Sequence, residues 1–229
     1  MILLALAESG FGKTASFVPS EKLGIKGLDP KDTYVISVTP KMLPLWKVTT
    51  PDKPQDGNRI ITDDGPTIAK LISGLAKSPF KNIILDDANY IMQNFYMKNA
   101  MKNGWETPKQ IGYFMGLIFT AMEEASAAGK NVIIFAHPET YKANTQGDLS
   151  YRMKTTGNMT QDYLTPEGKA DIMLFGINRW NESSKKVDKV FVTDHDGTYP
   201  AKSQGIFDDM YIPNDMGMIV DKINVFLGV

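Results

Sequence analysis

The chain opens with the stretch that decides its fold, MILLALAESGFGKT at residues 1–14. The apolar run Met1–Leu6 predicts a buried strand. The residues after it follow the pattern of a phosphate-binding loop, which is Gly, four free residues and then Gly-Lys-Ser/Thr, except that Ala7 takes the place of the first glycine. The stretch therefore predicts a strand, a loop and the first turn of a helix, with an entry turn that has a negative φ or is strained at Ala7.

The loop residues indicate a site for ATP and Mg²⁺. Gly10 and Gly12 allow successive backbone N–H groups to turn inward around phosphate oxygens, and the helix that follows presents its positive end to the same anion. Lys13 is expected to reach the β and γ oxygens, and the hydroxyl of Thr14 is expected to bind the metal. The alternative is a glycine-rich turn before an ordinary helix. The expected ATP-binding residues are Ser9, Gly10, Phe11, Gly12, Lys13, Thr14 and Ala15.

Composition limits the classes of protein that fit. The 229 residues are 42% hydrophobic and 22% charged, which is enough to bury a large core and argues against intrinsic disorder. The formal net charge of −1 means that any contact with nucleic acid needs a local basic patch or oligomerisation. The absence of cysteine excludes disulfides, thiolate zinc sites and a cysteine nucleophile.

The same features favour a cytoplasmic protein without a membrane anchor. The N-terminal apolar run is too short to span a bilayer, and it lacks the flanks of a secretion signal. A cytosolic compartment fits best. Nothing upstream of Met1 covers the edge of the first strand, so we expect a minimal protein or one completed by a neighbour.

Strand and helix patterns alternate along the chain, as in α/β proteins. This predicts a mostly parallel central sheet flanked by helices, in one domain over residues 1–229, with a flexible surface loop at Thr49–Asn58. The predicted strands after the first are Thr33–Val38, Asn82–Leu85, Asn131–Phe135, Asp171–Gly176 and Lys189–Thr193. The predicted helices are Pro66–Ala76, with Pro66 at its first position, Ala88–Asn103, Pro108–Ala128 and Asp215–Leu227.

A second chemical element follows the strand Asn82–Leu85, which ends in Asp86-Asp87. In phosphate-loop enzymes a hydrophobic strand neighbouring the loop ends in an acidic residue that holds Mg²⁺. Asp86 has that position, and Asp87 is expected to polarise the attacking water. The alternative is a pair of exposed acids at a strand end.

His137 ends the next core strand, where the carboxyl ends of parallel strands gather ligands. We expect it either to sense the γ-phosphate or simply to cap the strand through its own loop.

The segment Tyr141–Gly168 is polar and punctuated by glycine. It interleaves basic side chains, which bind phosphates, with flat side chains on which bases stack, as in proteins that bind single-stranded DNA without reading its sequence. A solvated hairpin would have a similar composition. As a mobile loop that contacts DNA it would use Lys142, Tyr151, Arg152 and Lys154.

Four stretches carry a resemblance: AESGFGKT, IILDDANYIM, VIIFAHPE and DGTYPAKSQGIFDDMYIPNDM. Together they resemble phage-encoded nucleotide-binding proteins of the RecA-like P-loop group, related to phage single-strand annealing and recombination ATPases. The resemblance implies a RecA-like core, ATP and Mg²⁺ binding, and self-assembly into a ring or filament. It also implies work on phage single-stranded DNA beside a single-strand-binding protein. By this likeness Lys202 is similar to the basic residue that reaches the nucleotide of a neighbouring subunit.

One departure bears on catalysis. RecA-like enzymes usually carry a glutamate just after the second strand, and here that place reads Ser37-Val38-Thr39-Pro40-Lys41. Either Asp87 supplies the base, or hydrolysis is slow and the protein chiefly binds ATP. Three classes therefore remain: a DNA-dependent ATPase, a nucleotide-gated assembly or binding module, and a small-molecule kinase. The kinase would need an arginine-rich lid, and the chain offers only Arg59, Arg152 and Arg179.

Overall fold

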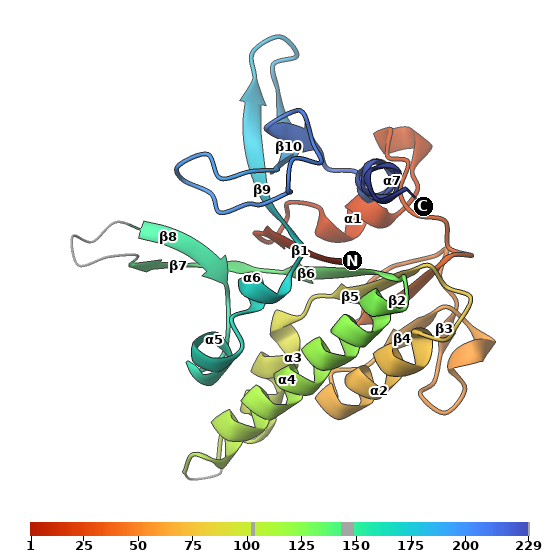
Figure 1. Ribbon diagram of the computed structural model, residues 1–229, viewed down its shortest axis with the longest axis vertical. Helices are drawn as coiled ribbons and strands as arrows, with labels where there is room; N and C mark the ends of the chain where they lie inside the picture. The colour runs from red at the N-terminus through yellow and green to blue at the C-terminus, as the bar shows by residue number, and fades with distance from the viewer. Residues whose placement is uncertain (102–103, 143–148, 229) are drawn as a thin grey trace.

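The computed structural model describes residues 1–101, 104–142 and 149–228. Over these residues one nine-stranded sheet has the order β11-β10-β9-β1-β6-β5-β2-β4-β3, and β7 pairs with β8 separately (Figure 1). The strands are β1 Ile2–Ala7, β2 Thr33–Ser37, β3 Val48–Thr49, β4 Arg59–Ile61, β5 Asn82–Asp86, β6 Asn131–Ala136, β7 Pro138–Lys142, β8 Leu149–Met153, β9 Ile172–Asn181, β10 Lys186–Val192 and β11 Tyr211–Pro213. The helices are α1 Lys13–Phe17, α2 Gly65–Leu75, α3 Asn89–Lys98, α4 Glu106–Ala127, α5 Met159–Tyr163, α6 Pro166–Lys169 and α7 Met216–Leu227, with short 3₁₀ turns η1 Glu21–Leu23 and η2 Pro54–Asp56.

The prediction of a mostly parallel sheet is confirmed. Every neighbouring pair from β9 to β3 is parallel, and only β10 and β11 run antiparallel to their neighbours. The expectation of an uncovered edge at the first strand is wrong, because β1 lies between β6 and β9. All six residues of β1 are buried, as is usual for a parallel strand covered on both faces.

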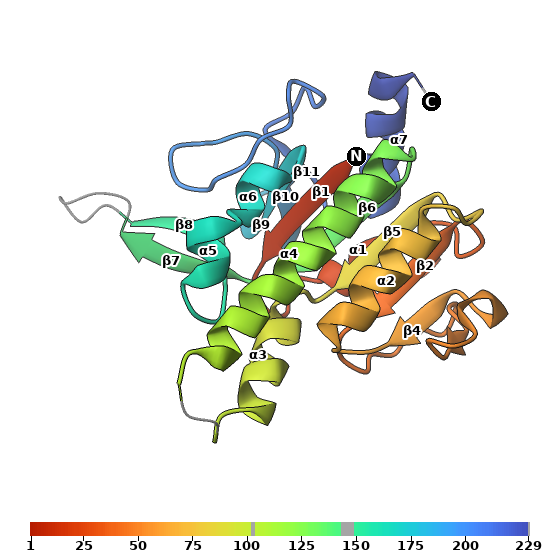
Figure 2. The ribbon, with the colours of Figure 1, turned by 60° about the horizontal axis from the view of Figure 1, so that its bottom comes forward.

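Two hydrophobic cores lie on opposite faces of the sheet, and β1 contributes to both in alternation. Leu4 and Leu6 pack in the core beneath α2, α3 and α4, whereas Leu3 and Ala5 pack in the core beneath α1 and α7. The two helical layers are visible in Figure 1, and Figure 2 shows the long helix α4 crossing the sheet. Across the described residues, none of the helices combines the length and the apolar character needed to cross a bilayer.

Several element bounds differ from their predictions for local reasons. Helix α2 begins one residue earlier than expected, because the carboxylate of Asp64 caps it by accepting a bond from the N–H of Thr67, and Pro66 therefore takes the second position. Helix α3 ends at Lys98, and residues 102–103 of its predicted extent lie outside the described residues. The predicted loop Thr49–Asn58 contains the end of β3 and the turn η2.

Two hairpins stand out from the sheet in Figure 1. One, β7–β8, lies in what was predicted to be a mobile loop, and α5 and α6 follow it, so the described part of that segment has regular structure. Its tip, residues 143–148, lies outside the described residues. The other hairpin joins β9 to β10, and both of its strands run beyond their predicted bounds.

The late part of the sequence packs against the start of the chain through Asp215. Its carboxylate caps α7 by accepting bonds from the N–H groups of Gly217 and Met218. It also accepts from the N–H groups of Lys26 and Gly27, at 2.6 and 3.1 Å. A Cβ on Gly217 would lie 1.9 Å from the carbonyl oxygen of Gly27, so the two backbones need a glycine there.

Candidate nucleotide-binding site

The loop between β1 and α1 has the backbone that its glycines predicted. Gly10 and Gly12 have φ values of 81° and 102°, in the left-handed region that favours glycine. Ala7 is the last residue of β1 and pairs with Gly176 of β9, so the chain enters the loop in an extended conformation without a glycine. A Cβ on Gly176 would lie 2.7 Å from Cβ of Ala7 and 2.6 Å from the ring of Phe11. The neighbouring strand thus provides the space that Ala7 occupies.

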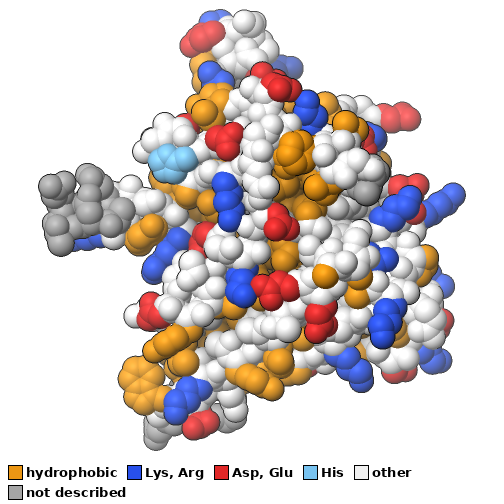
Figure 3. Space-filling model, in the orientation of Figure 1, with side chains coloured by type: hydrophobic (Ala, Val, Ile, Leu, Met, Phe, Trp, Pro, Cys, Tyr) orange, Lys and Arg blue, Asp and Glu red, His pale blue; other side chains and the backbone are white. Residues whose placement is uncertain are grey.

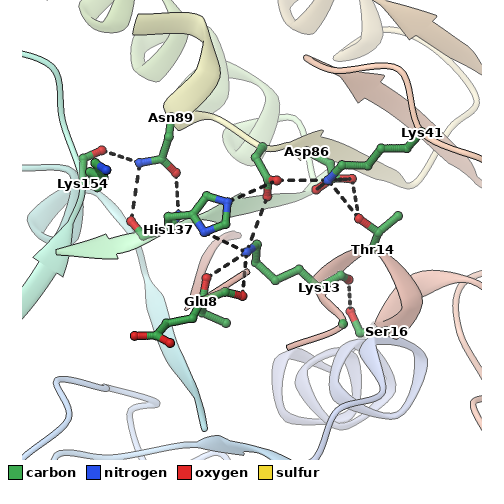
Figure 4. A network of polar contacts seen from close by, with 12 residues as sticks. Glu8, Lys13, Thr14, Ser16, Lys41, Asp86, Asn89, His137 and Lys154 are labelled. Carbon is green, nitrogen blue, oxygen red and sulfur yellow. Dashed lines mark hydrogen bonds and ion pairs between the residues drawn. The ribbon is translucent and has the colours of Figure 1, made fainter. Parts of the chain in front are cut away.

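Lys13 folds back over the loop that precedes it. Its Nζ atom donates to the carbonyl oxygens of Ala7 and Glu8, at 2.8 and 3.2 Å (Figure 4). The residue is buried, and this burial lowers the pKa of Lys13 despite the opposing effect of Asp87 and Asp86. The ammonium group is therefore held at the mouth of the loop by backbone oxygens.

Thr14 and Asp86 come together across the sheet. The hydroxyl of Thr14 donates to Oδ2 of Asp86 at 2.9 Å, and Asp86 is fully buried. Strand β5, which carries Asp86, is not the direct neighbour of β1, because β6 lies between them. The contact forms nevertheless, since α1 carries Thr14 to the carboxyl end of β5.

Lys41 is a site residue that the sequence analysis missed. Its Nζ atom lies 2.9 and 3.0 Å from the two carboxylate oxygens of Asp86, 3.0 Å from Oδ2 of Asp87 and 3.0 Å from Oγ1 of Thr14. Burial lowers the pKa of Lys41, but Asp86 and Asp87 outweigh it and the pKa is raised. A signal was present: Lys41 follows β2, a parallel strand beside β5, and ligands gather at such strand ends.

Asp87 lies among two lysines and a histidine. Its carboxylate lies 4.0 Å from Nζ of Lys13, 3.0 Å from Nζ of Lys41 and 3.6 Å from Nε2 of His137. These groups outweigh burial and lower the pKa of Asp87, whereas burial and the charge of Asp87 raise the pKa of Asp86 to about 6. Oδ1 of Asp87 is buried without a hydrogen-bond partner among the described residues.

His137 reaches the loop from the end of β6. Its Nδ1 atom lies 3.3 Å from Nζ of Lys13. Asn89 fixes the histidine backbone by accepting from its N–H and donating to its carbonyl oxygen, and the amide also donates to the carbonyl of Lys154 (Figure 4). The N–H of Lys154 donates to the carbonyl oxygen of His137 at 2.8 Å. The strand end and the hairpin β7–β8 are thereby tied to α3.

These groups open into one cavity of about 640 Å³. Its lining contains most of the residues expected to bind ATP, together with Lys41 and Tyr90. Phe11 differs, because its ring is buried and packs edge to face against Phe191 at 5.1 Å. The lining residues are Ser9, Gly10, Gly12, Lys13, Thr14, Ala15, Thr39, Lys41, Asp87, Tyr90 and His137.

The side chains present fit Mg²⁺ bound together with phosphate. Thr14 and Asp86 offer adjacent hard oxygen ligands, and Mg²⁺ is usually held by one or two carboxylates plus water and substrate phosphates. Over the ranges that the structure describes, no group of three or more His, Cys, Asp or Glu side chains is placed to hold a metal. A phosphate would supply the missing oxygens.

Two further residues brace the loop from the late part of the chain. Lys189 of β10 donates to the carbonyl oxygen of Gly10 at 2.8 Å, and Asn214 donates to that of Gly12 at 3.3 Å. Asn214 belongs to the Ile-Pro-Asn-Asp run, and Asp215 in that run caps α7. The loop contact and the cap give this stretch a structural role that sequence analysis did not assign.

Lys202 does not line this cavity. Its backbone forms a bridge with Met173, which pairs with Leu4 in the middle of β1 rather than with the loop end. The role that the resemblance implies for Lys202, contact with the nucleotide of a neighbouring subunit, stays a prediction.

The residues expected to bind DNA all lie at the hairpin β7–β8, but in different environments. Tyr151 packs against Phe175 and Tyr199, with ring centroids 5.1 and 5.4 Å away. Arg152 pairs with Glu139 at 2.9 Å and lies over the ring of Tyr141. The structure therefore gives Tyr151 and Arg152 partners within the chain, whereas Lys142 and Lys154 are exposed.

The sheet, the glycine loop and the Thr14–Asp86 contact together define an α/β protein with a P-loop architecture. Comparison with known protein families finds none that matches the chain, and comparison with curated proteins also finds none. Among solved structures, the chain is similar to a KaiC-like protein of the hyperthermophilic archaeon Pyrococcus horikoshii OT3. The match has a TM-score of 0.47 and 13% identity, and it covers 83% of this chain and 76% of the other. At these values the likeness says nothing about activity, which has to be argued from the residues of this chain.

Proposed function

We propose that this protein is a RecA-like P-loop NTPase that binds ATP with Mg²⁺ in the cavity over the β1–α1 loop. The observation that carries the proposal is the convergence of Lys13, Thr14 and Asp86 at one end of that loop. An ammonium group, a hydroxyl and a buried carboxylate at this spacing suit a nucleotide phosphate bound with its metal.

Each group has a part in binding. The backbone N–H groups at the start of α1 would face the phosphates, and Lys13 would exchange its bonds to the carbonyls of Ala7 and Glu8 for bonds to phosphate oxygens. Thr14 and Asp86 would hold Mg²⁺, which would neutralise phosphate charge. Lys189 and Asn214 keep the loop open by bonding its outward carbonyls.

We further propose that hydrolysis is slow, which favours the nucleotide-gated binding or assembly module. Asp87 is the only carboxylate among the residues that line the described cavity. Its lowered pKa makes it a weak proton acceptor, and a general base works best with a pKa near the working pH. The kinase class has the least support, since Arg59 bonds Ser37 and the carbonyl of Lys41, and Arg179 lies over the ring of Tyr211.

Contact with single-stranded DNA is a second candidate function, in line with the resemblance. The exposed side chains of Lys142 and Lys154 on the hairpin beside the site favour it. Acidic and basic side chains are interspersed over the face shown in Figure 3, so such a contact would be local. Assembly into a ring or filament, and a single-strand-binding partner, would follow from the same function.

The test of ATP binding is calorimetry on the wild type, Lys13→Met and Lys22→Met. Loss of a charge-assisted contact should weaken ATP binding by on the order of 2–3 kcal/mol in Lys13→Met. Lys22→Met, a change on the exposed turn η1, should bind like the wild type. Equal affinity of Lys13→Met and the wild type would show that the site is misassigned.

A further inference from the structure

Lys41 lies where a metal bound by Thr14 and Asp86 would be expected. Its Nζ atom is within 3.0 Å of four oxygens, which belong to Thr14, Asp86 and Asp87. Two carboxylates and a hydroxyl form a ligand set that suits a hard divalent cation. In this structure the ammonium group of the chain itself occupies the centre of that set (Figure 4).

The backbone that carries Lys41 is fixed. Arg59 is buried, donates to the carbonyl oxygen of Lys41 at 2.8 Å and donates to the hydroxyl of Ser37 at 3.1 Å. Two residues further on, Leu43 is buried in the core beneath α1 and α7. The backbone at Lys41 is thus anchored, and Lys41 can leave the oxygens of Thr14, Asp86 and Asp87 only by a movement of its side chain.

The local charges balance without a metal. Lys13 and Lys41 carry two positive charges, and Asp86 and Asp87 carry two negative charges within 4.0 Å. Buried carboxylates are strongly destabilising unless they are paired. In the metal-free protein Lys41 therefore neutralises the carboxylates that a bound cation would otherwise neutralise.

We propose that Lys41 is an internal competitor for Mg²⁺, whose ammonium group must leave the oxygens of Thr14 and Asp86 before the metal can bind them. Mg²⁺ requires these oxygens at about 2.0–2.1 Å, and a second cation bonded to the same oxygens would be repelled at short range. That the metal arrives with a nucleotide rests on the proposed function. The competition itself concerns only the chain and the metal.

The exchange links metal binding to phosphate binding. Lys41 lines the same cavity as Lys13, and a quarter of its side chain is exposed. Once displaced, its ammonium group remains in the cavity and can pair with phosphate oxygens. Metal without nucleotide has to displace Lys41 with no such compensation, so free Mg²⁺ should bind weakly.

The test is titration with Mn²⁺ in the absence of nucleotide, followed by electron paramagnetic resonance of the free ion. Lys41→Met keeps the length of the side chain and removes its charge, and Lys70→Met on the exposed face of α2 is the matched control. Lys41→Met should bind Mn²⁺ about 10-fold or more tightly than the wild type, with Mg²⁺ competing for the site. Lys70→Met should match the wild type. An affinity of Lys41→Met equal to or below that of the wild type would overturn the proposal.

A second pair of variants covers the case in which Lys41→Met does not fold. Lys41→Met with Asp87→Asn removes one charge of each sign and keeps Thr14 and Asp86. It should bind Mn²⁺ more tightly than Asp87→Asn alone, and the opposite order would count against competition. Calorimetry with ATP on the same proteins separates the two proposals. If these proteins bind ATP and Lys41→Met leaves the Mn²⁺ affinity unchanged, only the competition is refuted. If Lys13→Met, measured beside them, binds ATP as tightly as the wild type, only the proposed function is refuted.

Discussion

Nδ1 of His137 lies 3.3 Å from Nζ of Lys13, although 124 positions separate the two residues in the chain. An ammonium group only donates, so Nδ1 is the acceptor and the ring proton is on Nε2, the atom 3.6 Å from Asp87. His137 therefore connects the lysine of the loop to the carboxylate expected to act on water.

His137→Ala should reduce the preference for ATP over ADP. The ring sits where Lys13 and Asp87 meet, so its contacts should depend on the γ-phosphate more than on the rest of the nucleotide. Loss of one charge-assisted hydrogen bond should lower the ratio of the two affinities by about 10-fold. Calorimetry with both nucleotides measures it, and His195→Ala, at the other histidine of the chain, should leave the ratio unchanged. An unchanged ratio in His137→Ala would leave the ring with a structural role only.

Asp87→Asn should keep ATP binding and lose turnover by about 10²-fold or more, the usual scale for a general base. The amide cannot accept a proton from water, but it retains the shape of the carboxylate. Phosphate release under saturating ATP is the measurement, and Asp162→Asn on α5 is the control. Equal rates in Asp87→Asn and the wild type would remove Asp87 from the reaction. A wild type without measurable hydrolysis would support the binding module.

The metal-free protein should lose stability as the pH rises from about 4 to 6 because of Asp86. Its pKa is raised to about 6, so the folded protein holds a proton there that the unfolded chain releases at lower pH. The lowered pKa of Asp87 contributes stability that is lost only as the pH falls, below this window. The free energy of unfolding is measured with urea in the presence of a chelator. Between about pH 4 and 6, that of the wild type should fall by on the order of 1–3 kcal/mol relative to that of Asp86→Asn. If the free energies of unfolding of the two proteins changed in parallel with pH, the raised pKa of Asp86 would be contradicted.

If the hairpin β7–β8 binds single-stranded DNA, its exposed lysines should set the salt dependence. Each phosphate neutralised on a single strand contributes about −0.7 to the slope of log affinity against log salt concentration. Lys142→Gln with Lys154→Gln should therefore flatten the slope by about 1.4, whereas Arg152→Gln should change it less because Arg152 already pairs with Glu139. A fluorescent oligonucleotide titrated at several salt concentrations gives the slopes. Lys185→Gln with Lys186→Gln, on the other hairpin, is the control, and equal slopes in all proteins would remove the hairpin from DNA binding.

The parts of the site that could be predicted are those fixed by local spacing. The strand, the glycines and Lys13 lie within one short stretch, and Thr14 and Asp86 follow from a pattern of two segments. The order of the strands could not be predicted, because nothing local states that β6 lies between β1 and β5.

The contacts of Lys41 could not be predicted for a related reason. It meets Asp86 across 45 positions, and a lysine after a strand is most often a surface residue. Lys189 and Asn214 reach the loop from 179 and 202 positions away, through strand pairing that only the folded chain shows. The predicted roles of Lys202 and of the hairpin residues came from resemblance or composition, and they stay predictions.

The packing of Ala7 against Gly176 changes what a sequence search for this kind of loop should look for. The glycine that the pattern demands at the end of the first strand is found here on the adjacent strand, at Gly176, where a Cβ would lie 2.7 Å from the Cβ of Ala7. A pattern that scores the loop alone counts Ala7 as a defect and rejects chains of this type. Scoring the positions of Ala7 and Gly176 jointly, with glycine required at one of them, would recover such chains. A sequence with alanine at both positions would then be expected not to form the loop.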